Sequence, residues 1–404
     1  CGAWVMSEFK NLPSGWKVVR LGDVFKKSFY GTSKTTSING KYPVLRMGNM
    51  QNGTLDLRDL VYIDLEENEF EKYRLHKGDI LLNRTNSHSL VGKVSLFDLD
   101  GDYLTASYLV AFRPNLKVLN PTFSNNLLNT IRYQEKIRTI ATKGVSQSNI
   151  NPTSFKNIIK IPLPPLDEQK KIAEILSTWD EAINLTINLI ESKKQFKKAL
   201  MQNLLTAKIR FPEFKDEWKE TKLGKCLKEK SDRNTKNIDL VLSVTNKFGF
   251  VTQVEYFDKS VASDNMTNYK IVKKGNFAYN PSRINVGSIA LLESYEIGIL
   301  SPMYVVFECL KNSDNRFLKF WFQSHSFMGN LYKYLAGSVR ESLNFKDMKT
   351  ISIKLPNLNE QQKIAEVLAA CDGEINLLNL KLENLKKQKQ GLMQKLLSGK
   401  VRVR

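Results

Sequence analysis

One segment of this sequence occurs twice, and the repeat constrains the fold more than any other feature. LDEQKKIAEILSTWDEAINL begins at Leu166, and LNEQQKIAEVLAACDGEINL begins at Leu358, 192 residues later. Residues 168–210 and 360–402 are identical at about half of their aligned positions. Because two copies are too few for a solenoid, the repeat indicates a duplicated module.

A shorter match lies upstream of each copy. GWKVVRLGDVF from Gly15 is similar to EWKETKLGKCL from Glu217, with Trp16 opposite Trp218. Each module therefore consists of a divergent block followed by the repeated segment. We predict two blocks and two segments in alternation, at residues 11–163, 164–210, 211–355 and 356–400.

The repeated segment is predicted to be a long helix. Prolines precede it in IPLPPLDEQ, and the residue ahead of a proline avoids the α region. Asp167 and Asn359 are the predicted N-caps, and Glu168 and Glu360 place carboxylates at the positive end of the helix dipole. Gly399 is the predicted terminator of the second helix.

Apolar residues recur in both segments in alternating steps of three and four, which is the spacing of a coiled-coil seam. Thr186, Lys193 and Lys197 interrupt the seam of the first copy, and Lys389 interrupts that of the second. We predict that the two helices pair as an antiparallel coiled coil, although the seam alone does not fix their direction. The alternative is two unrelated amphipathic helices, each packed on its own block. The predicted seam residues are Ile172, Leu176, Trp179, Ile183, Ile190, Leu200, Leu204, Ile364, Leu368, Cys371, Ile375, Leu378, Leu382, Leu385, Leu392 and Leu396.

Both divergent blocks are predicted to be rich in strands, and each ends in a polar loop. KGDILLNRTNSHSLVGKVSLF from Lys77 aligns loosely with KGNFAYNPSRINVGSIALL from Lys274. The closing loops are KGVSQSNINPTSFKNI and AGSVRESLNFKDM. Polar loops on a rigid sheet suit the recognition of base edges, because Arg pairs with guanine and Asn or Gln with adenine. The candidate DNA-contacting residues are Arg84, Asn86, Lys143, Ser146, Gln147, Arg283, Asn285, Ser338 and Arg340; a phosphate contact or a solvated side chain is the alternative for each.

The charge of the chain favours a polyanionic partner. Its 61 Lys and Arg against 41 Asp and Glu give a formal net charge of +20. Such an excess indicates nucleic acid first and an anionic membrane surface second, with a generally basic, solvated surface as the alternative. The sequence contains no apolar run of the ~18–20 residues that a membrane-spanning helix needs, so we expect no membrane partner.

The sequence lacks recognisable motifs for catalysis or cofactor binding. Its three histidines are not at metal-ligand spacing, and it contains neither a P-loop nor G-x-G-x-x-G. NPSR from Asn280 and PEFKDEWKE from Pro212 match a methyltransferase and a nuclease motif only in part, and we interpret both as chance. The four cysteines are scattered, which fits a reducing cytosol. We predict a cytoplasmic chain with no catalytic residue, metal or cofactor of its own.

This arrangement resembles the specificity subunit of type I restriction-modification systems. The residues that carry the resemblance are IPLPPLDEQKKIAEIL and IKLPNLNEQQKIAEVL, the openings GWKVVRLGDV and EWKETKLGKC, and the loop RESLNFKDM. The resemblance covers the chain from about residue 11 to residue 400. The first closing loop departs from the pattern, with Gln147 where Arg340 stands and three extra residues after Asn151.

The resemblance implies an α+β fold with a pseudo-twofold internal repeat. Two α/β target recognition domains (11–163 and 211–355) would alternate with two long spacer helices (164–210 and 356–400) that pair as an antiparallel coiled coil. Each domain would read one half of a bipartite, asymmetric site in double-stranded DNA, and the helices would set the distance between the halves. Two modification subunits would dock on the helical region and methylate adenine with S-adenosylmethionine. Restriction subunits, which use ATP and Mg²⁺, would join them.

Two other functions stay open at this point: a stand-alone DNA-modifying enzyme and a basic coiled-coil scaffold protein. Methylation of DNA by the purified chain would favour the first. Binding that is insensitive to DNA sequence would favour the second.

Overall fold

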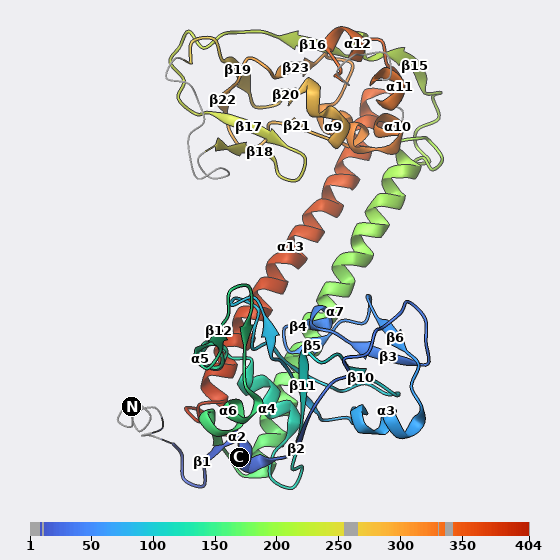
Figure 1. The fold of residues 1–404 in the computed structure, drawn as a ribbon. Coiled ribbons are helices and arrows are strands. Elements are labelled where there is room, and N and C mark those ends of the chain that lie inside the picture. Colours follow the sequence, from blue (N-terminus) through green and yellow to red (C-terminus); the bar gives the residue numbers. More distant parts are fainter. Residues whose placement is uncertain (1–8, 10–11, 254–265, 330, 336–341, 404) are drawn as a thin grey trace. The chain divides into compact units, whose positions relative to one another are not determined.

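The computed structural model describes residues 9, 12–253, 266–329, 331–335 and 342–403 (Figure 1). The chain divides into two compact units: unit 1 is residues 1–187 with 381–404, and unit 2 is residues 188–380. Each unit therefore contains one divergent block and one half of each long helix. This grouping differs from the predicted division into four parts, which stays a prediction.

The centre of unit 1 is a four-stranded antiparallel sheet in the order β2-β11-β7-β9. Unit 1 also contains two three-stranded sheets, β10-β3-β6 and β12-β13-β8, and two strand pairs, β1-β14 and β4-β5. The strands are β1 (Lys17–Arg20), β2 (Phe25–Tyr30), β3 (Tyr42–Leu45), β4 (Met50–Gln51), β5 (Thr54–Leu55), β6 (Val61–Ile63), β7 (Ile80–Asn83), β8 (Thr85–Asn86), β9 (Val94–Leu96), β10 (Leu104–Thr105), β11 (Leu109–Pro114), β12 (Thr142–Lys143), β13 (Ser148–Asn149) and β14 (Lys160–Leu163).

The central sheet of unit 1 buries both of its faces. Successive side chains of a strand point to opposite faces, so Ile80 and Leu82 of β7 enter one core while Leu81 enters another. The first of these cores also receives Phe123 and Phe155 from flanking helices. The helical elements of this block are α2 (Leu21–Val24), η1 (Met47–Asn49), α3 (Glu67–Tyr73), α4 (Pro121–Leu128), α5 (Ile131–Thr139) and α6 (Pro152–Ile158).

Unit 2 contains a comparable four-stranded antiparallel sheet, in the order β16-β23-β20-β21. Its core is aromatic: Phe277 stacks on Phe307 with 5.1 Å between ring centroids, and Phe322 meets Phe307 edge-on. The strands are β15 (Lys219–Lys222), β16 (Leu227–Lys230), β17 (Leu242–Thr245), β18 (Gly249–Thr252), β19 (Lys270–Lys273), β20 (Phe277–Tyr279), β21 (Ile289–Leu291), β22 (Ile297–Leu300), β23 (Val305–Cys309) and β24 (Ser352–Leu355). The helical elements are η2 (Leu223–Lys225), η3 (Pro281–Val286), α9 (Asn315–Gln323), α10 (His325–Met328), α11 (Leu331–Leu335) and α12 (Phe345–Met348).

Both blocks are closed in the same way. The strand that follows the first matching tryptophan, β1, pairs antiparallel with β14, and its equivalent β15 pairs antiparallel with β24. Lys17 lies opposite Leu163 in the first pair, and Lys219 lies opposite Leu355 in the second. Each block thus begins and ends in one two-stranded ribbon directly before its long helix. This common frame and the helix pairing below confirm the predicted α+β fold with an internal repeat.

The repeated segments form two helices of 39 residues each, α7 (Leu166–Leu204) and α13 (Leu358–Leu396). Their starts differ from the prediction. Asp167 and Asn359 are already inside the helices, and the cap of α13 is Asn357, whose Oδ1 accepts a hydrogen bond from Glu360 N at 2.9 Å. The cap prediction was wrong because it shifted the start of each helix by two residues. In the described part of the chain, no helix is long and apolar enough to cross a bilayer.

The predicted seam residues lie on the protected face of each helix. Ile172, Leu176, Ile364 and Leu368 are buried in the cores of their own units. The remaining predicted seam residues are buried or half-buried, as are the interrupting residues Thr186, Lys193, Lys197 and Lys389.

Ion pairs show the direction of the two helices inside each unit. In unit 1, Asp180 of α7 accepts from Lys389 of α13 at 2.5 Å, and Glu168 pairs with Arg402 at 2.7 Å. The partner of the later residue in α7, Asp180, comes before the partner of Glu168 in the sequence, so the two helix segments run antiparallel. In unit 2 the equivalent pairs are Asp372–Lys197 at 2.6 Å and Glu360–Arg210 at 2.8 Å.

The distribution of charge along the repeat explains this direction. The first half of each helix (166–187 and 358–380) is mainly acidic, and the second half (188–204 and 381–396) is mainly basic. In an antiparallel arrangement each acidic half faces a basic half, whereas a parallel arrangement would bring like charges together. Opposite charges at a few ångströms attract and like charges repel, so the charges fix what the apolar seam leaves open.

Candidate nucleic-acid interface

Two candidate residues of unit 1, Asn86 and Lys143, lie in one small sheet, β12-β13-β8. Arg84 directly precedes β8, and Ser146 and Gln147 lie between β12 and β13. Asn86 in β8 lies opposite Ser148 in β13, and Lys143 in β12 lies opposite Ser148 on the other side. The pairing of β8 with β13 therefore joins residues that are 62 and 64 positions apart in the chain. Lys143, Ser146 and Gln147 are all exposed at the tip of the β12–β13 hairpin.

The β12–β13 hairpin has a tight turn at its tip. Gly144 N donates to Gln147 O at 2.8 Å. A Cβ atom at Gly144 would lie 2.7 Å from the same carbonyl oxygen, which is closer than real Cβ atoms come. Glycine is therefore required here, and the turn presents Ser146 and Gln147 to solvent.

Arg84 is held at the junction of β7 and β8. Its backbone N donates to Tyr108 O at 3.0 Å, and its carbonyl accepts from Ile150 N at 2.8 Å. Its guanidinium carbon lies 5.3 Å from the ring centroid of Tyr30, whose side chain is half exposed. Among the described residues, no carboxylate forms an ion pair with Arg84, and its Nε is buried without a hydrogen bond. The result is a cation that lies over an aromatic ring and has no ion-pair partner in the described part of the chain.

Asn86 is engaged locally in this structure. Its Oδ1 accepts from Ser87 N at 2.8 Å, and its Nδ2 lies 3.2 Å from the Sδ of Met47. Ser148, opposite Asn86, is buried, and its Oγ lies 3.4 Å from Nδ1 of the exposed His88. To bind a base edge, the side-chain amide of Asn86 would have to give up its contacts with Ser87 and Met47.

Sequence reasoning missed Tyr30, Tyr108 and His88. Tyr30 ends β2, and Tyr108 precedes β11; both are half exposed and both touch Arg84, one through its ring and the other through its carbonyl. His88 was within the polar turn that follows Arg84. The position of His88, two residues after the candidate Asn86, is the signal that could have identified it. Its contact with Ser148 depends on the register between β8 and β13, which the sequence does not show.

In unit 2 the candidates Arg283 and Asn285 belong to η3, which Asn280 caps through its Oδ1. Arg283 is exposed and Asn285 is half-buried. The closing segment returns to this element, because Leu343 N donates to Pro281 O at 3.2 Å. Ser338 and Arg340 lie outside the described residues.

The junctions in the two units are built alike. Ile150 N donates to the carbonyl of Arg84, which follows Asn83, and Leu343 N donates to the carbonyl of Pro281, which follows Asn280. The glycines that the sequence aligns beyond these points, Gly92 and Gly287, both have left-handed backbones with φ of 88° and 82°. The same frame thus carries Arg in one unit and Pro in the other, so the side chains it presents differ.

The closing helices show how the first block departs from the second. Asn151 caps α6 and Asn344 caps α12 through equivalent side-chain hydrogen bonds. α6 has seven residues and α12 has four. The strands that follow begin nine residues after Asn151 (β14) and eight residues after Asn344 (β24), so up to this strand the two closing segments differ in length by one residue. Phe155 of α6 and Phe345 of α12 are each buried in the core of their own unit.

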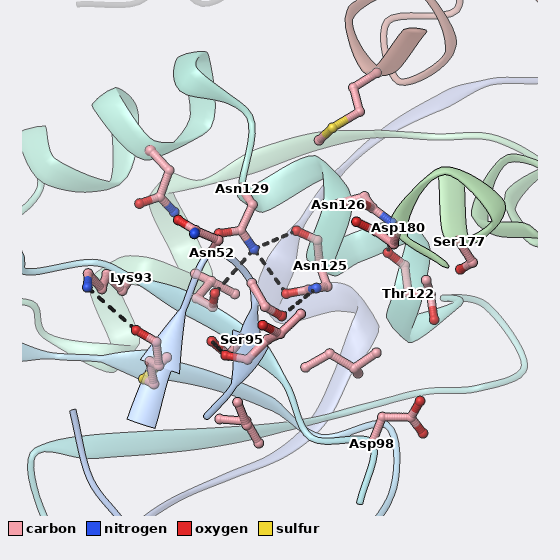
Figure 2. Close-up of a pocket in the computed structure, with 18 of the residues that line it drawn as sticks. Asn52, Lys93, Ser95, Asp98, Thr122, Asn125, Asn126, Asn129, Ser177 and Asp180 are labelled. Carbon is pink, nitrogen blue, oxygen red and sulfur yellow. Dashed lines mark hydrogen bonds between the residues drawn. The ribbon is translucent and has the colours of Figure 1, made fainter. Parts of the chain in front are cut away.

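A pocket of about 640 Å³ in unit 1 is lined by residues of β4, β5, β9 and α4 and by Asp180 and Lys389 of the two long helices (Figure 2). Asn125 donates to Gly53 O at 3.0 Å, Asn129 donates to Val94 O at 3.2 Å, and Ser95 Oγ donates to Thr54 O at 3.0 Å. These side chains use their hydrogens to fasten the β4–β5 hairpin to α4 and β9. These hydrogen bonds make this wall of the pocket part of the framework of unit 1.

Two cysteines of unit 2 have raised pKa values. Burial raises the pKa of Cys309 to about 12, and burial also raises the pKa of the Cys226 thiol. Thiols of this kind stay protonated near neutral pH and are poor nucleophiles. Within the described residues, no group of three or more His, Cys, Asp or Glu side chains could hold a metal ion.

The chain is similar to known proteins of one family over nearly its whole length. The family model for the type I restriction modification DNA specificity domain matches residues 13–194 and, a second time, residues 216–387. The putative type I restriction enzyme MjaX specificity subunit of Methanocaldococcus jannaschii is 30% identical, over 98% of this chain and 96% of its own length. The EcoKI specificity subunit of Escherichia coli is 24% identical over 96% and 90% of the two chains. The crystal structure of a type I restriction-modification S subunit from M. genitalium superposes with a TM-score of 0.59 at 17% identity and covers 96% of each chain.

Proposed function

Because the chain belongs to the family of type I restriction-modification DNA specificity subunits, which are not the catalytic subunits of these systems, we propose that it reads a bipartite, asymmetric DNA site. Target recognition domain 1 would read one half of the site and target recognition domain 2 the other. By this reading the chain directs adenine methylation and restriction that are carried out by partner subunits.

The observation that carries the proposal is the pair of equivalent junctions with different side chains. The same backbone hydrogen bond joins Ile150 to Arg84 in unit 1 and Leu343 to Pro281 in unit 2. A protein that reads one symmetric site twice would need the same side chains at both places. Equivalent frames with different side chains instead suit two unlike half-sites, as an asymmetric target requires.

The charge of the chain supports double-stranded DNA as the target. Contacts to phosphates supply most of the affinity, and contacts to bases supply the discrimination. The net charge of +20 serves the first need, and the exposed hairpin residues Ser146 and Gln147, with Arg84 beside them, serve the second. Arg84 would pair with guanine O6 and N7 in the major groove.

The partners follow from the same proposal. Two modification subunits would bind the chain and carry S-adenosylmethionine, and restriction subunits would carry ATP and Mg²⁺. This chain would hold none of these groups itself. We place the assembly in the cytoplasm, where chromosomal DNA and a reducing environment for its free thiols coincide.

The test is base-resolved adenine methylation of the source genome with this gene intact and deleted. Deletion should abolish methylation at one split motif. Exchange of residues 211–355 for those of a relative should then change only one half of that motif. If no motif changes, even when the cognate modification subunits are co-expressed, the proposal is wrong and a basic scaffold becomes the better explanation.

A further inference from the structure

One helix of each block is anchored to a long helix in the same way in both units. The backbone N of Asn120, the N-cap of α4, donates to the side chain of Gln169 in α7 at 2.8 Å. The backbone N of Asp314, the N-cap of α9, donates to the side chain of Gln361 in α13 at 2.9 Å. The two caps are therefore equivalent, and so are the positions that lie equally far after them.

One of these equivalent positions differs in size and polarity between the units. Six residues after its cap, α9 has Phe320, whose buried ring centroid lies 5.1 Å from Nζ of Lys197. Lys197 belongs to the ion pair that joins the two long helices within unit 2. Six residues after its cap, α4 has Asn126, which lines the 640 Å³ pocket together with the ion pair of Asp180 and Lys389 (Figure 2). Unit 1 therefore has a polar pocket where unit 2 has an aromatic ring.

The pocket contains hydrogen-bond acceptors that the protein leaves unused. The side chain of Asn126 donates through Nδ2 to Thr122 O at 3.0 Å, and the residue is only 6% exposed. Gln134 of α5 donates through Nε2 to Gly92 O at 3.3 Å and to Leu128 O at 2.9 Å. These bonds fix the orientation of both amides, and no described residue donates to Asn126 Oδ1 or Gln134 Oε1. Both residues line the pocket, so a ligand with N–H donors would satisfy the two oxygens.

The pocket also contains cations without a carboxylate partner. Arg138 of α5 is half-buried, and no described carboxylate forms an ion pair with it. Lys93 is half-buried as well, and its Nζ lies 3.5 Å from Met50 O. Of the carboxylates that line the pocket, Asp180 is already in its ion pair and Asp98 is exposed. Two such cations balance one phosphate monoester, which carries a charge of about −1.5 to −2 at neutral pH.

These features together select a class of ligand. Unused amide oxygens suit the edge of a nucleobase with an exocyclic amino group, and half-buried cations suit a phosphate. The volume of 640 Å³ lies within the range of small-molecule sites, about 300–1,000 Å³. Met50 and Met393, which also line the pocket, provide apolar surface for the face of a base. A nucleoside triphosphate would carry more negative charge than the two cations balance.

We propose that this pocket binds a free nucleoside monophosphate whose base carries an exocyclic amino group. The base edge donates to Asn126 Oδ1 and Gln134 Oε1, and the phosphate pairs with Arg138 and Lys93. The site does not include Arg84 or the tip of the β12–β13 hairpin, and the inference does not rest on the proposed function. Unit 2 is not expected to bind the ligand at the equivalent place, because Phe320 occupies it.

The experiment is isothermal titration calorimetry of the full chain with the monophosphates of adenosine, guanosine, cytidine and uridine. Cytidine and uridine monophosphate are a matched pair, because uracil has a carbonyl where cytosine has its amino group. The cytidine nucleotide should bind at one site per chain, about threefold to tenfold more tightly than the uridine nucleotide. Arg138→Gln should weaken binding of the cytidine nucleotide by about tenfold or more, and should leave the weaker binding of unphosphorylated cytidine unchanged.

Three further variants separate the contributions of shape, base recognition and charge. Asn126→Phe gives α4 the residue that α9 has at Phe320 and should abolish binding, because the ring fills the pocket. Asn126→Leu has a similar volume and should make the affinities for the cytidine and uridine nucleotides equal. Lys117→Gln, at an exposed lysine of unit 1 outside this pocket, is the control and should bind like the wild type. Thermal unfolding without ligand verifies that each variant is folded.

The other outcomes would overturn the inference. If none of the four monophosphates binds, or if folded Asn126→Phe binds like the wild type, the pocket is not a nucleotide site. If inorganic phosphate binds as tightly as the cytidine nucleotide, the pocket is an anion site without base recognition. If a DNA duplex displaces the bound nucleotide, the pocket contacts a DNA strand and the free ligand is refuted.

Discussion

Arg402 donates two hydrogen bonds to the carboxylate of Glu168, at 3.1 and 2.7 Å. Arg210 does the same to Glu360, at 2.9 and 2.8 Å. Each bond pair links the segment after one long helix to the start of the other, inside one unit. The two sites differ in one respect: Trp16 Nε1 also donates to Glu168 at 3.1 Å, whereas Trp218 Nε1 is buried without a partner among the described residues.

Removal of the two arginines should therefore have unequal effects. Arg402→Ala leaves Glu168 with its tryptophan donor and should lower the free energy of unfolding of unit 1 by about 1–2 kcal/mol. Arg210→Ala leaves the side chain of Glu360, which is only 1% exposed, without that help and should lower the free energy of unfolding of unit 2 by about 3 kcal/mol. Hydrogen exchange of each unit at rising urea concentration measures both. Equal losses would show that the tryptophan contributes nothing, and Lys170→Ala at an exposed pair is the control.

The Glu168 carboxylate should make stability depend on pH. Arg402, and then the Trp16 hydrogen bond, hold the pKa of Glu168 below its usual value, against the opposing effect of burial. A depressed pKa in the folded state stabilises above the ordinary pKa of Glu, ~4.3, and this gain is lost as pH falls through the folded pKa. The stability difference between the wild type and Glu168→Gln should be constant from neutral pH to about 5.5 and shrink below about 4.5. Exposed Glu174→Gln is the control; a difference that grows on acidification would contradict the assignment.

Replacement of Ala207 by glycine should stabilise the folded protein. It has a left-handed backbone with φ of 58°, at the position where the second copy has Gly399 with φ of 75°. This conformation costs an L-residue roughly 1 kcal/mol, so Ala207→Gly should raise the free energy of unfolding by about 0.5–1 kcal/mol. Gly399→Ala should lower it by more, because the new Cβ would also lie 2.6 Å from Pro13 Cδ. Chemical denaturation of both variants tests this, and a destabilised Ala207→Gly would refute it.

Arg84 should determine specificity in one half of the DNA site. Arg84→Ala should relax the preference at one base pair, with a loss of about 1–3 kcal/mol of discrimination. Tyr30→Leu should act in the same direction by about 0.5–1 kcal/mol, because it removes the ring beneath the guanidinium, whereas Tyr30→Phe should have little effect. Binding of a panel of single-base variants of the mapped site measures these changes.

Lys143 provides the contrast for Arg84. Its exposed side chain on β12 suits a phosphate contact, so Lys143→Ala should weaken binding to all duplexes alike and reduce the salt dependence. If Arg84→Ala behaves in the same way, Arg84 contacts phosphate and not a base.

Much of this architecture could be predicted from local patterns. The 192-residue repeat, the spacing of Ile172 and Leu176, and the matching Ile364 and Leu368 indicate two equivalent helices, and the structure has both at 39 residues. The alignment of Asn83 with Asn280 also corresponds to one shared backbone junction. The exact helix starts could not be predicted, because Asn357 and Asn359 are equally good caps by residue type and only the backbone selects one.

The sequence by itself determined the duplicated module, the helical period, the excess of positive charge and the polar loops. The period and the loops depend on residues that are near one another in the chain, and the repeat and the charge depend only on which residue types occur and where. The sequence even contained the acidic and basic halves of the repeat, which explain the antiparallel direction once the ion pairs are seen. Only the tertiary structure decided that Tyr30 supports Arg84 and that Arg402 meets Glu168. Those contacts depend on strand register and on where distant segments return, and local chemistry leaves both undetermined.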